Sequence, residues 1–142
     1  MGGAGSREVG TLAERALVEL LKGWGFEASW DPKSRVDVVA RKEGRTLVLE
    51  VKLLRVPGIV DVREIQVRRA VELAKKLGGE AVLAMYIAFL KEWRALPMSR
   101  VAELPVSAWR CGGRVERAIL VPASHVFAAP RLEEYLRARG LL

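Results

Sequence analysis

Apolar residues recur at intervals of three and four near the start of the chain, which is the spacing of one face of a helix. This pattern predicts a helix over about residues 7–24, with inward positions at Leu12, Ala13, Ala16, Leu17, Leu20, Leu21 and Trp24. The same spacing predicts a second helix over residues 61–77, which a pair of glycines would end. A short third helix is expected over residues 131–139.

Strand-like runs occupy most of the remaining chain. Two runs rich in β-branched residues, 35–42 and 45–54, flank Glu43-Gly44, and this arrangement is typical of a β-hairpin with a two-residue turn. Further strands are expected at residues 26–30, 81–90, 93–96 and 114–121. The order of helices and strands predicts an α/β fold in which helices flank a mixed central β-sheet.

The length of 142 residues suits one domain, and we expect residues 7–142 to form it behind a flexible, glycine-rich N-terminus at residues 1–6. The single cysteine and single histidine exclude an intrachain disulfide, a cysteine-based zinc site and a paired-histidine metal site. The longest apolar run, residues 81–90, is too short to span a bilayer, and no secretory leader is evident. These features predict a soluble cytoplasmic protein with no membrane partner.

Positive charge is concentrated in one part of the chain. Residues 33–76 hold 12 basic and 6 acidic residues, whereas residues 1–32 hold 3 basic and 5 acidic residues. A polyanion such as nucleic acid is therefore a candidate partner, and a generally basic surface is the alternative. Asparagine is absent and glutamine occurs once, a composition that together with many charged residues is expected of a thermophile.

The hairpin is where the chemistry is concentrated. If Glu43-Gly44 forms its turn, Asp37 and Glu50 lie directly opposite each other on one face, and Lys52 follows on the same face. Two carboxylates in such a position repel each other unless a positive charge lies between them. Mg²⁺ prefers carboxylate oxygens, so a metal site is favoured over the alternative of a surface salt-bridge network.

Glu14 is a third acidic candidate because it falls within the apolar stripe of the first helix. A structural alternative is equally specific. Thr11 and Glu14 have the spacing of a capping box, in which the glutamate would bind only the backbone at the helix start. From the residues alone, the capping role is favoured.

Asp37 followed by Glu50-Val51-Lys52 resembles the (D/E)-x-K core of the restriction-endonuclease-like nucleases. The wider pattern is similar to the archaeal Holliday-junction resolvases. It is carried by residues 10–15, Leu20-Leu21, Gly25-Phe26, 36–40 and 49–52, then by residues 77–84 and Trp93-Arg94.

This resemblance implies a restriction-endonuclease-like fold and a homodimeric enzyme that cuts four-way DNA junctions with Mg²⁺ or Mn²⁺. The catalytic residues that it implies are Glu14, Asp37, Glu50 and Lys52, and the metal ligands are Asp37, Glu50, the Val51 carbonyl and Glu14. C-terminal apolar residues such as Ile119, Val121 and Val126 are the expected dimer interface. Candidate DNA contacts are Arg15, Lys33, Ser34, Arg35, Arg55 and Arg63.

One segment departs from the family pattern. The resolvases carry a Ser/Gly-rich loop with a catalytic serine ahead of the aspartate, whereas residues 29–34 read Ser-Trp-Asp-Pro-Lys-Ser, with neither serine at that position. A DNA-binding paralogue that does not cut, or that has another specificity, is therefore the alternative function. Gln66, the sole glutamine, resembles one found after the lysine strand in related nucleases, with a surface role as the alternative. Trp30 is a candidate for stacking on an unpaired base or for partial burial in the core.

Overall fold

A five-stranded mixed sheet forms the centre of the molecule. The computed structural model describes residues 2–30 and 36–142, with side chains described from Leu12 onward. The strands lie in the order β1-β2-β3-β5-β6. All neighbours are antiparallel except β3 and β5, which are parallel. Their bounds are β1 Glu27–Trp30, β2 Val38–Lys42, β3 Arg45–Leu54, β5 Glu80–Ile87 and β6 Glu92–Pro97.

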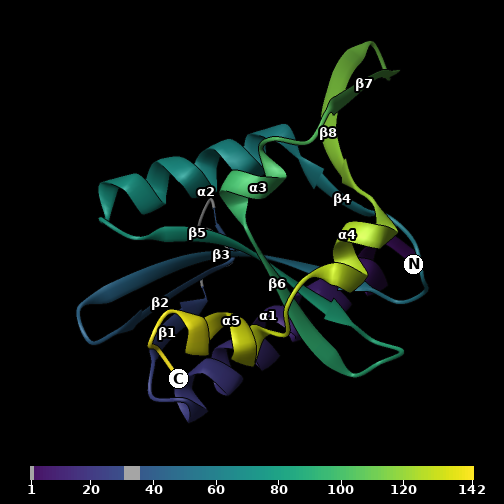
Figure 1. Ribbon diagram of the computed structural model, residues 1–142. Helices are drawn as coiled ribbons and strands as arrows, with labels where there is room; N and C mark the ends of the chain where they lie inside the picture. The colour runs from purple at the N-terminus through teal and green to yellow at the C-terminus, as the bar shows by residue number, and fades with distance from the viewer. Residues whose placement is uncertain (1, 31–35) are drawn as a thin grey trace.

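Helices cover both faces of this sheet, as Figure 1 shows with α1 and α5 below it and α2 and α3 above it. The helix α1 (Gly2–Gly23) packs with α5 (Leu132–Ala138) on one apolar core. The other face carries α2 (Glu64–Lys76), α3 (Met98–Val101) and α4 (Ala123–Ala128) on a second core. Successive residues of β3 alternate between the two cores, so Leu49 and Val51 face α1 while Val48 and Leu54 face α2. No helix of the described residues is long and apolar enough to cross a membrane.

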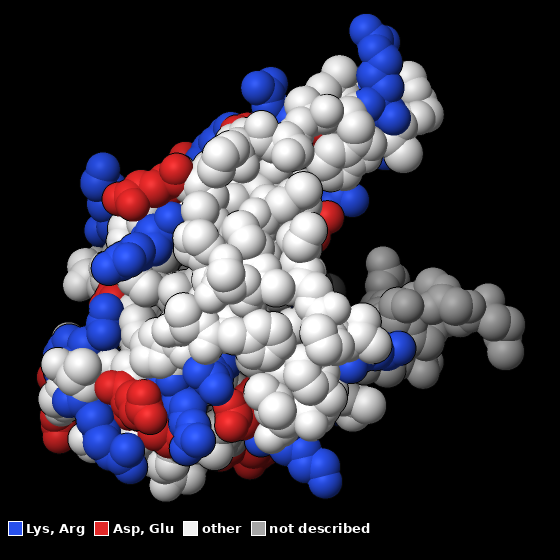
Figure 2. All heavy atoms as spheres, turned by 45° about the vertical axis from the view of Figure 1, so that its right-hand side comes forward, with Lys and Arg blue, Asp and Glu red and all other residues white. Residues whose placement is uncertain are grey.

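A smaller antiparallel sheet lies beside α2, in the order β4-β8-β7. It consists of β4 (Val60–Arg63), β7 (Val106–Cys111) and β8 (Arg114–Val121). The outer part of the β7–β8 hairpin extends away from the rest of the protein, as Figures 1 and 2 show. The inner part of this sheet is anchored by buried apolar side chains, including Val62, Ile119 and Val121.

The predicted mixed sheet and the register of the central hairpin are confirmed. Lys42 pairs with Arg45, and Val38 pairs with Leu49. Glu43 and Gly44 have φ of 52° and 76°, which are the positive values that a two-residue type I′ turn requires. Asp37 immediately precedes β2, so the same register continued by one residue places it opposite Glu50.

Residues 61–63 differ from the prediction, because they form strand β4 and the helix begins only at Glu64. Val60 and Val62 are buried while Asp61 and Arg63 are exposed, a period of two that belongs to a strand. Pairing with β8, which lies far along the chain, selects this conformation. Strand β7 and helices α3 and α4 were not predicted from the sequence.

The first helix begins at Gly2 and therefore includes most of the segment expected to precede it. Thr11 lies well inside α1, where its backbone is already helical, so the predicted capping box is wrong. Glu14 has no helix start to cap, and its role must come from contacts with other elements.

The expected dimer interface is also wrong. Ile119, Val121 and Val126 are each at most 2% exposed within a single chain, where they pack against α2 and the central sheet. A partner subunit cannot reach these side chains, and their apolar character is explained by the core of one protomer.

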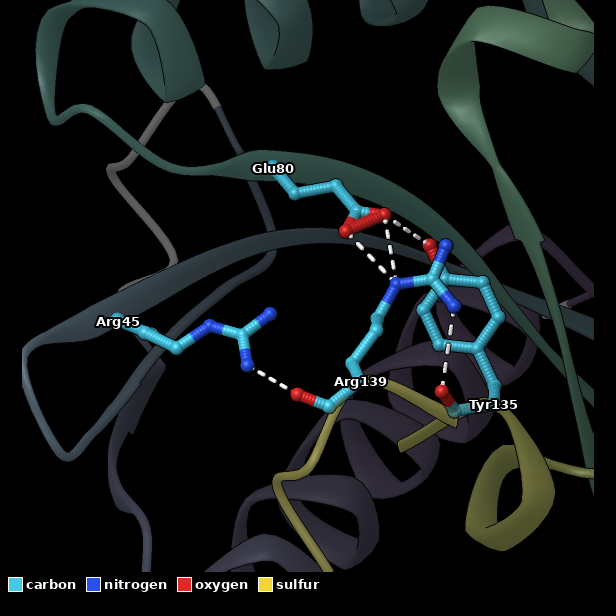
Figure 3. A network of polar contacts seen from close by, with 4 residues as sticks. All are labelled: Arg45, Glu80, Tyr135 and Arg139. Atoms are coloured by element: carbon cyan, nitrogen blue, oxygen red, sulfur yellow. Dashed lines mark hydrogen bonds and ion pairs between the residues drawn. The ribbon is translucent and has the colours of Figure 1, made fainter. Parts of the chain in front are cut away.

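A polar network joins the C-terminal helix to the central sheet (Figure 3). The Nε atom of Arg139 donates to both carboxylate oxygens of Glu80 at 2.8 and 3.0 Å, and the Tyr135 hydroxyl also donates to this carboxylate. Arg45 of β3 donates to the Arg139 carbonyl oxygen. Burial alone would raise the pKa of Glu80, but the hydrogen bonds from Arg139 and Tyr135 outweigh it and hold this pKa below its ordinary value.

We expect this network to make the free energy of unfolding fall as the pH is lowered. Because the pKa of Glu80 is lowered in the folded state, the network stabilises the protein above the ordinary pKa of 4.5, and this contribution disappears as the pH falls through the lowered pKa. Glu80→Gln should lower the free energy of unfolding at neutral pH by about 1 kcal/mol and flatten its decline in acid. Urea denaturation across a pH series measures both effects, and an unchanged acid limb in the variant would contradict the assignment.

Candidate active site

Three carboxyl groups from separate elements meet at one end of the central hairpin. Glu50 lies in β3, Asp37 lies just before β2, and Glu14 reaches them from α1. An Asp37 carboxylate oxygen accepts a hydrogen bond from the Val51 backbone N–H at 2.8 Å, which fixes the aspartate beside β3. Glu50 is only 2% exposed and is the one charged residue buried among those whose side chains are described.

Burial and mutual repulsion dominate the electrostatics of this cluster. Burial, followed by the charge of Asp37, raises the pKa of Glu50 to about 9. The same two causes, in the same order, raise the pKa of Glu14 to about 7. Lys52 acts in the opposite direction on both groups but does not offset the effect. The cluster thus carries more potential negative charge than its one lysine can neutralise.

Lys52 is held in place by α2. Its Nζ donates to the Gln66 side-chain oxygen at 3.0 Å, and the same oxygen accepts the Arg63 backbone N–H at 3.0 Å. Gln66 therefore joins the lysine on β3 to the junction of β4 and α2. The surface role considered for Gln66 from the sequence is wrong, because this half-buried side chain directly contacts the site.

Trp30 is the partner of Glu14 that the sequence did not reveal. Its indole N–H donates to the Glu14 carboxylate, and the guanidinium of Arg15 lies 4.8 Å from the ring centroid. The tryptophan is partly buried against the α1 core, in agreement with the second of the two roles expected for it. The two residues are far apart in the sequence, so this contact is seen only in the fold, where α1 packs against β1.

The donor set of this site fits a hard divalent cation. Asp37 and Glu50 supply carboxylate oxygens at an excess of negative charge, which Mg²⁺ prefers over nitrogen or sulfur ligands. Within the described part of the chain, no group of three or more His, Cys, Asp or Glu side chains is arranged to hold a metal ion. An ion here would therefore need further oxygens from the backbone, water or substrate, as is usual for Mg²⁺.

The structure separates the candidate DNA contacts into three groups. Arg15 and Arg55 are exposed, the first on α1 and the second just after β3. Arg63 is exposed but forms a 2.6 Å ion pair with Glu116 of β8. Lys33, Ser34 and Arg35 lie outside the described residues, as does most of the segment at 29–34 that departs from the family pattern.

An apolar groove of about 740 Å³ lies away from the carboxyl cluster, between α1 and the end of the sheet formed by β6. Leu12, Trp24 and Trp93 are among its lining residues, whereas none of the three acids contributes to it. The carboxyl cluster on the hairpin is thus separate from this groove.

The chain matches a family model described as archaeal Holliday junction resolvase (Hjc), over residues 5–121. Two relatives are each called crossover junction endodeoxyribonuclease Hje. The protein from Saccharolobus islandicus (strain REY15A) is 32% identical and that from Saccharolobus solfataricus (strain ATCC 35092 / DSM 1617 / JCM 11322 / P2) is 30% identical. Both matches cover 72% of this chain and 81% of the relative.

Two solved structures share the fold. Hjc from Archaeoglobus fulgidus, a Holliday junction resolvase, superposes with a TM-score of 0.68 at 23% identity over 89% of this chain and 93% of its own. D212, a nuclease from a fusselovirus, superposes with a TM-score of 0.55 at 14% identity over 99% of this chain and 94% of its own. These similarities confirm the predicted fold class.

The crowding of acids predicts an unusual effect of neutralising one of them. In the absence of divalent ions, Glu50→Gln should be at least as stable as the parent, because it replaces a buried acid that faces Asp37 with a neutral side chain of similar shape. Glu80→Gln is the matched control, since it makes the same change where the carboxylate is well paired. Urea denaturation in EDTA should give Glu50→Gln a free energy of unfolding equal to or above that of the parent, and Glu80→Gln a lower one. Equal losses in both would rule out uncompensated repulsion at Glu50.

Proposed function

This chain belongs to the archaeal Holliday-junction resolvase family and is a nuclease that resolves such junctions, and we propose that it does so by metal-dependent, paired hydrolysis of phosphodiester bonds as a homodimer. The observation that carries the proposal is the buried Glu50 facing Asp37, with Lys52 on the same strand. Acids crowded in this way are expected where a cation and a phosphate are to be bound.

Asp37 and Glu50 would hold Mg²⁺ or Mn²⁺, with the Val51 carbonyl and Glu14 as further oxygen donors. When bound, the ion supplies Lewis-acid stabilisation of charge at the scissile phosphate and lowers the pKa of water. The hydrogen bond from the Val51 N–H keeps one Asp37 oxygen directed at β3 and leaves the other for the cation. Trp30 orients Glu14 in the same way.

Lys52 would act on the phosphate itself. Its ammonium group can stabilise the negative charge that develops on the phosphoryl oxygens, or orient the attacking water. The hydrogen bond to Gln66 restricts this long side chain to one position, so less conformational freedom is lost when the substrate binds.

The proposed homodimer follows from the reaction, since two incisions in symmetry-related strands require two sites in a fixed geometry. Ile119, Val121 and Val126 would not belong to the interface of such a dimer, because they are buried within a single chain. Light scattering of the protein alone and with junction DNA tests this assembly, and a monomer in both conditions would contradict it.

Substitutions at the site should separate cutting from binding. Asp37→Asn and Glu50→Gln should reduce junction cleavage in Mg²⁺ by orders of magnitude, because both remove a metal ligand. Junction binding in EDTA should be retained in both variants. Asp37→Asn should strengthen it by removing a negative charge beside a phosphate, whereas Glu50→Gln should change it little, because the raised pKa of Glu50, about 9, keeps this group mostly uncharged at neutral pH without a cation. Lys52→Ala should also abolish cutting but weaken binding slightly.

The matched control for these variants is Asp61→Asn, which removes the same charge from an exposed position of β4. A four-way junction and a linear duplex of the same sequences should be assayed side by side. Preference for the junction and loss of activity only in the site variants support the proposal. An Asp37→Asn protein that cuts junctions at the parental rate would exclude this site, and cutting in EDTA would exclude metal dependence.

Binding should also depend steeply on salt. The basic excess of residues 33–76 provides several potential phosphate contacts, and each adds about −0.9 to the slope of log affinity against log salt concentration. Fluorescence anisotropy with a labelled junction at several salt concentrations gives the slope. An affinity that stays constant from low to moderate salt would show that phosphate contacts do not drive binding.

A further inference from the structure

The β7–β8 hairpin has a buried base and an exposed outer part. The two strands pair from Val106–Ile119 at the base to Cys111–Arg114 at the tip. Ala118 and Ile119 are buried at the base, whereas both strands are almost entirely exposed beyond Ser107 and Arg117. A two-residue turn at Gly112-Gly113, with φ of 57° and 80°, keeps the tip narrow. The outer part is therefore a two-stranded ribbon with exposed side chains, and ion pairs from Glu116 to Arg63 and from Arg117 to Glu64 tie its inner end to β4 and α2.

This ribbon is positively charged along its exposed length. Arg110, Arg114 and Arg117 project from it, and Glu116 is its one acidic residue. Arg63 already neutralises Glu116 through a 2.6 Å ion pair. Figure 2 shows basic side chains, in blue, at the outer end of the projection. Arg114 lies 3.8 Å from the same Glu116, and Arg117 lies 3.7 Å from Glu64 of α2. Among the described residues Arg110 has no acidic partner, so the positive charge on the ribbon exceeds the negative charge beside it.

The arginines occur on both faces of the ribbon. Residues paired across an antiparallel ladder share a face, so Arg117 opposite Ala108 and Arg110 opposite Val115 lie on one face. Arg114, opposite Cys111, lies on the other face. A ribbon with cations on both faces is suited to a groove with anions on both walls. The major groove of duplex DNA, lined by phosphates and wide enough for a two-stranded ribbon, has this form.

The base of the ribbon is also fixed relative to the catalytic lysine. Strand β4 pairs with β8 over four residues and leads directly into α2. At this junction the Arg63 N–H donates to Gln66, which in turn accepts the hydrogen bond from Lys52. A ligand bound by the ribbon would therefore have a fixed position relative to Lys52.

We propose that the β7–β8 ribbon is a DNA-binding arm that grips the duplex of a junction arm at a distance from the scissile phosphate. The inference rests on the proposed function for the identity of the substrate, and it adds a second contact region that the catalytic cluster does not supply. The exposed apolar residues Trp109 and Val115 also suit a second copy of the chain. A polyanion is favoured because Arg110 has no acidic partner among the described residues and Arg114 shares Glu116 with Arg63.

The charge of the arm is tested by a pair of double variants. Arg110→Gln/Arg114→Gln should weaken junction binding in EDTA and lower the magnitude of the salt slope by roughly 1–2, as expected for the loss of up to two phosphate contacts. Lys75→Gln/Lys76→Gln is the control, since it removes equal charge from the opposite end of α2. A larger slope change in the arm variant supports the proposal. Equal changes in both pairs, or none in the arm variant, overturn it.

The position of the arm on DNA can be mapped directly, because Cys111 is the sole cysteine and is exposed near the tip. A hydroxyl-radical-generating iron chelate attached to Cys111 of an Asp37→Asn protein should cleave a bound junction in one short region of its duplex arms. The same treatment of an Asp37→Asn/Cys111→Ser protein provides the background. Scission no greater than background overturns the proposal, as does a change of oligomeric state in the arginine variant with DNA binding intact.

These measurements are independent of the proposed catalysis. If the parent protein binds junctions but does not cut them in Mg²⁺, the proposed function fails while the arm can still be assessed by binding and scission. If the parent protein cuts junctions and neither arm measurement responds, only the arm proposal fails.

Discussion

The rest of this site depends on one interaction, in which a buried carboxyl group faces a second carboxyl group. Glu50 lies in the central strand of an apolar sheet with almost no access to solvent, and Asp37 faces it. The repulsion is maintained because the two-residue turn and the ladder of β2 and β3 fix the register. A strand shifted by one residue would place Glu50 in the opposite core, so the fold as a whole holds the acids together.

The helices around the hairpin supply further side chains to the site. Glu14 adds a third carboxyl group from α1, oriented by Trp30, and Gln66 on α2 restrains Lys52. The site is therefore assembled from both faces of the sheet at the end where β2 begins, which helices on the two faces can reach. A stable core would not need these contacts. They fit the proposed function, in which they hold charged groups beside a cation and a phosphate.

The parts of this arrangement that could be predicted from the sequence are those set by local pattern. The register of Asp37 and Glu50 followed from Glu43-Gly44 and strand alternation alone. The predictions failed where distant partners decide the outcome. Residues 61–63 became a strand because β8 pairs with them, and β7 exists because β8 offers it an edge. From the residues alone, the spacing of Thr11 and Glu14 favoured a capping role, and only the family resemblance implied a role for Glu14 in the site. Its contact with Trp30 depends on how α1 packs against β1.

The locality of the hairpin also has a consequence for the order of folding. Asp37 and Glu50 are joined by a short chain with a two-residue loop, whereas the parallel pairing of β3 with β5 must wait for residues 55–79 to cross over the sheet. We therefore expect the two acids to meet before α2 brings Gln66 to Lys52. If the pairing of β2 with β3 is already formed in the transition state, the crowding of the two acids raises the folding barrier as well as the energy of the native state.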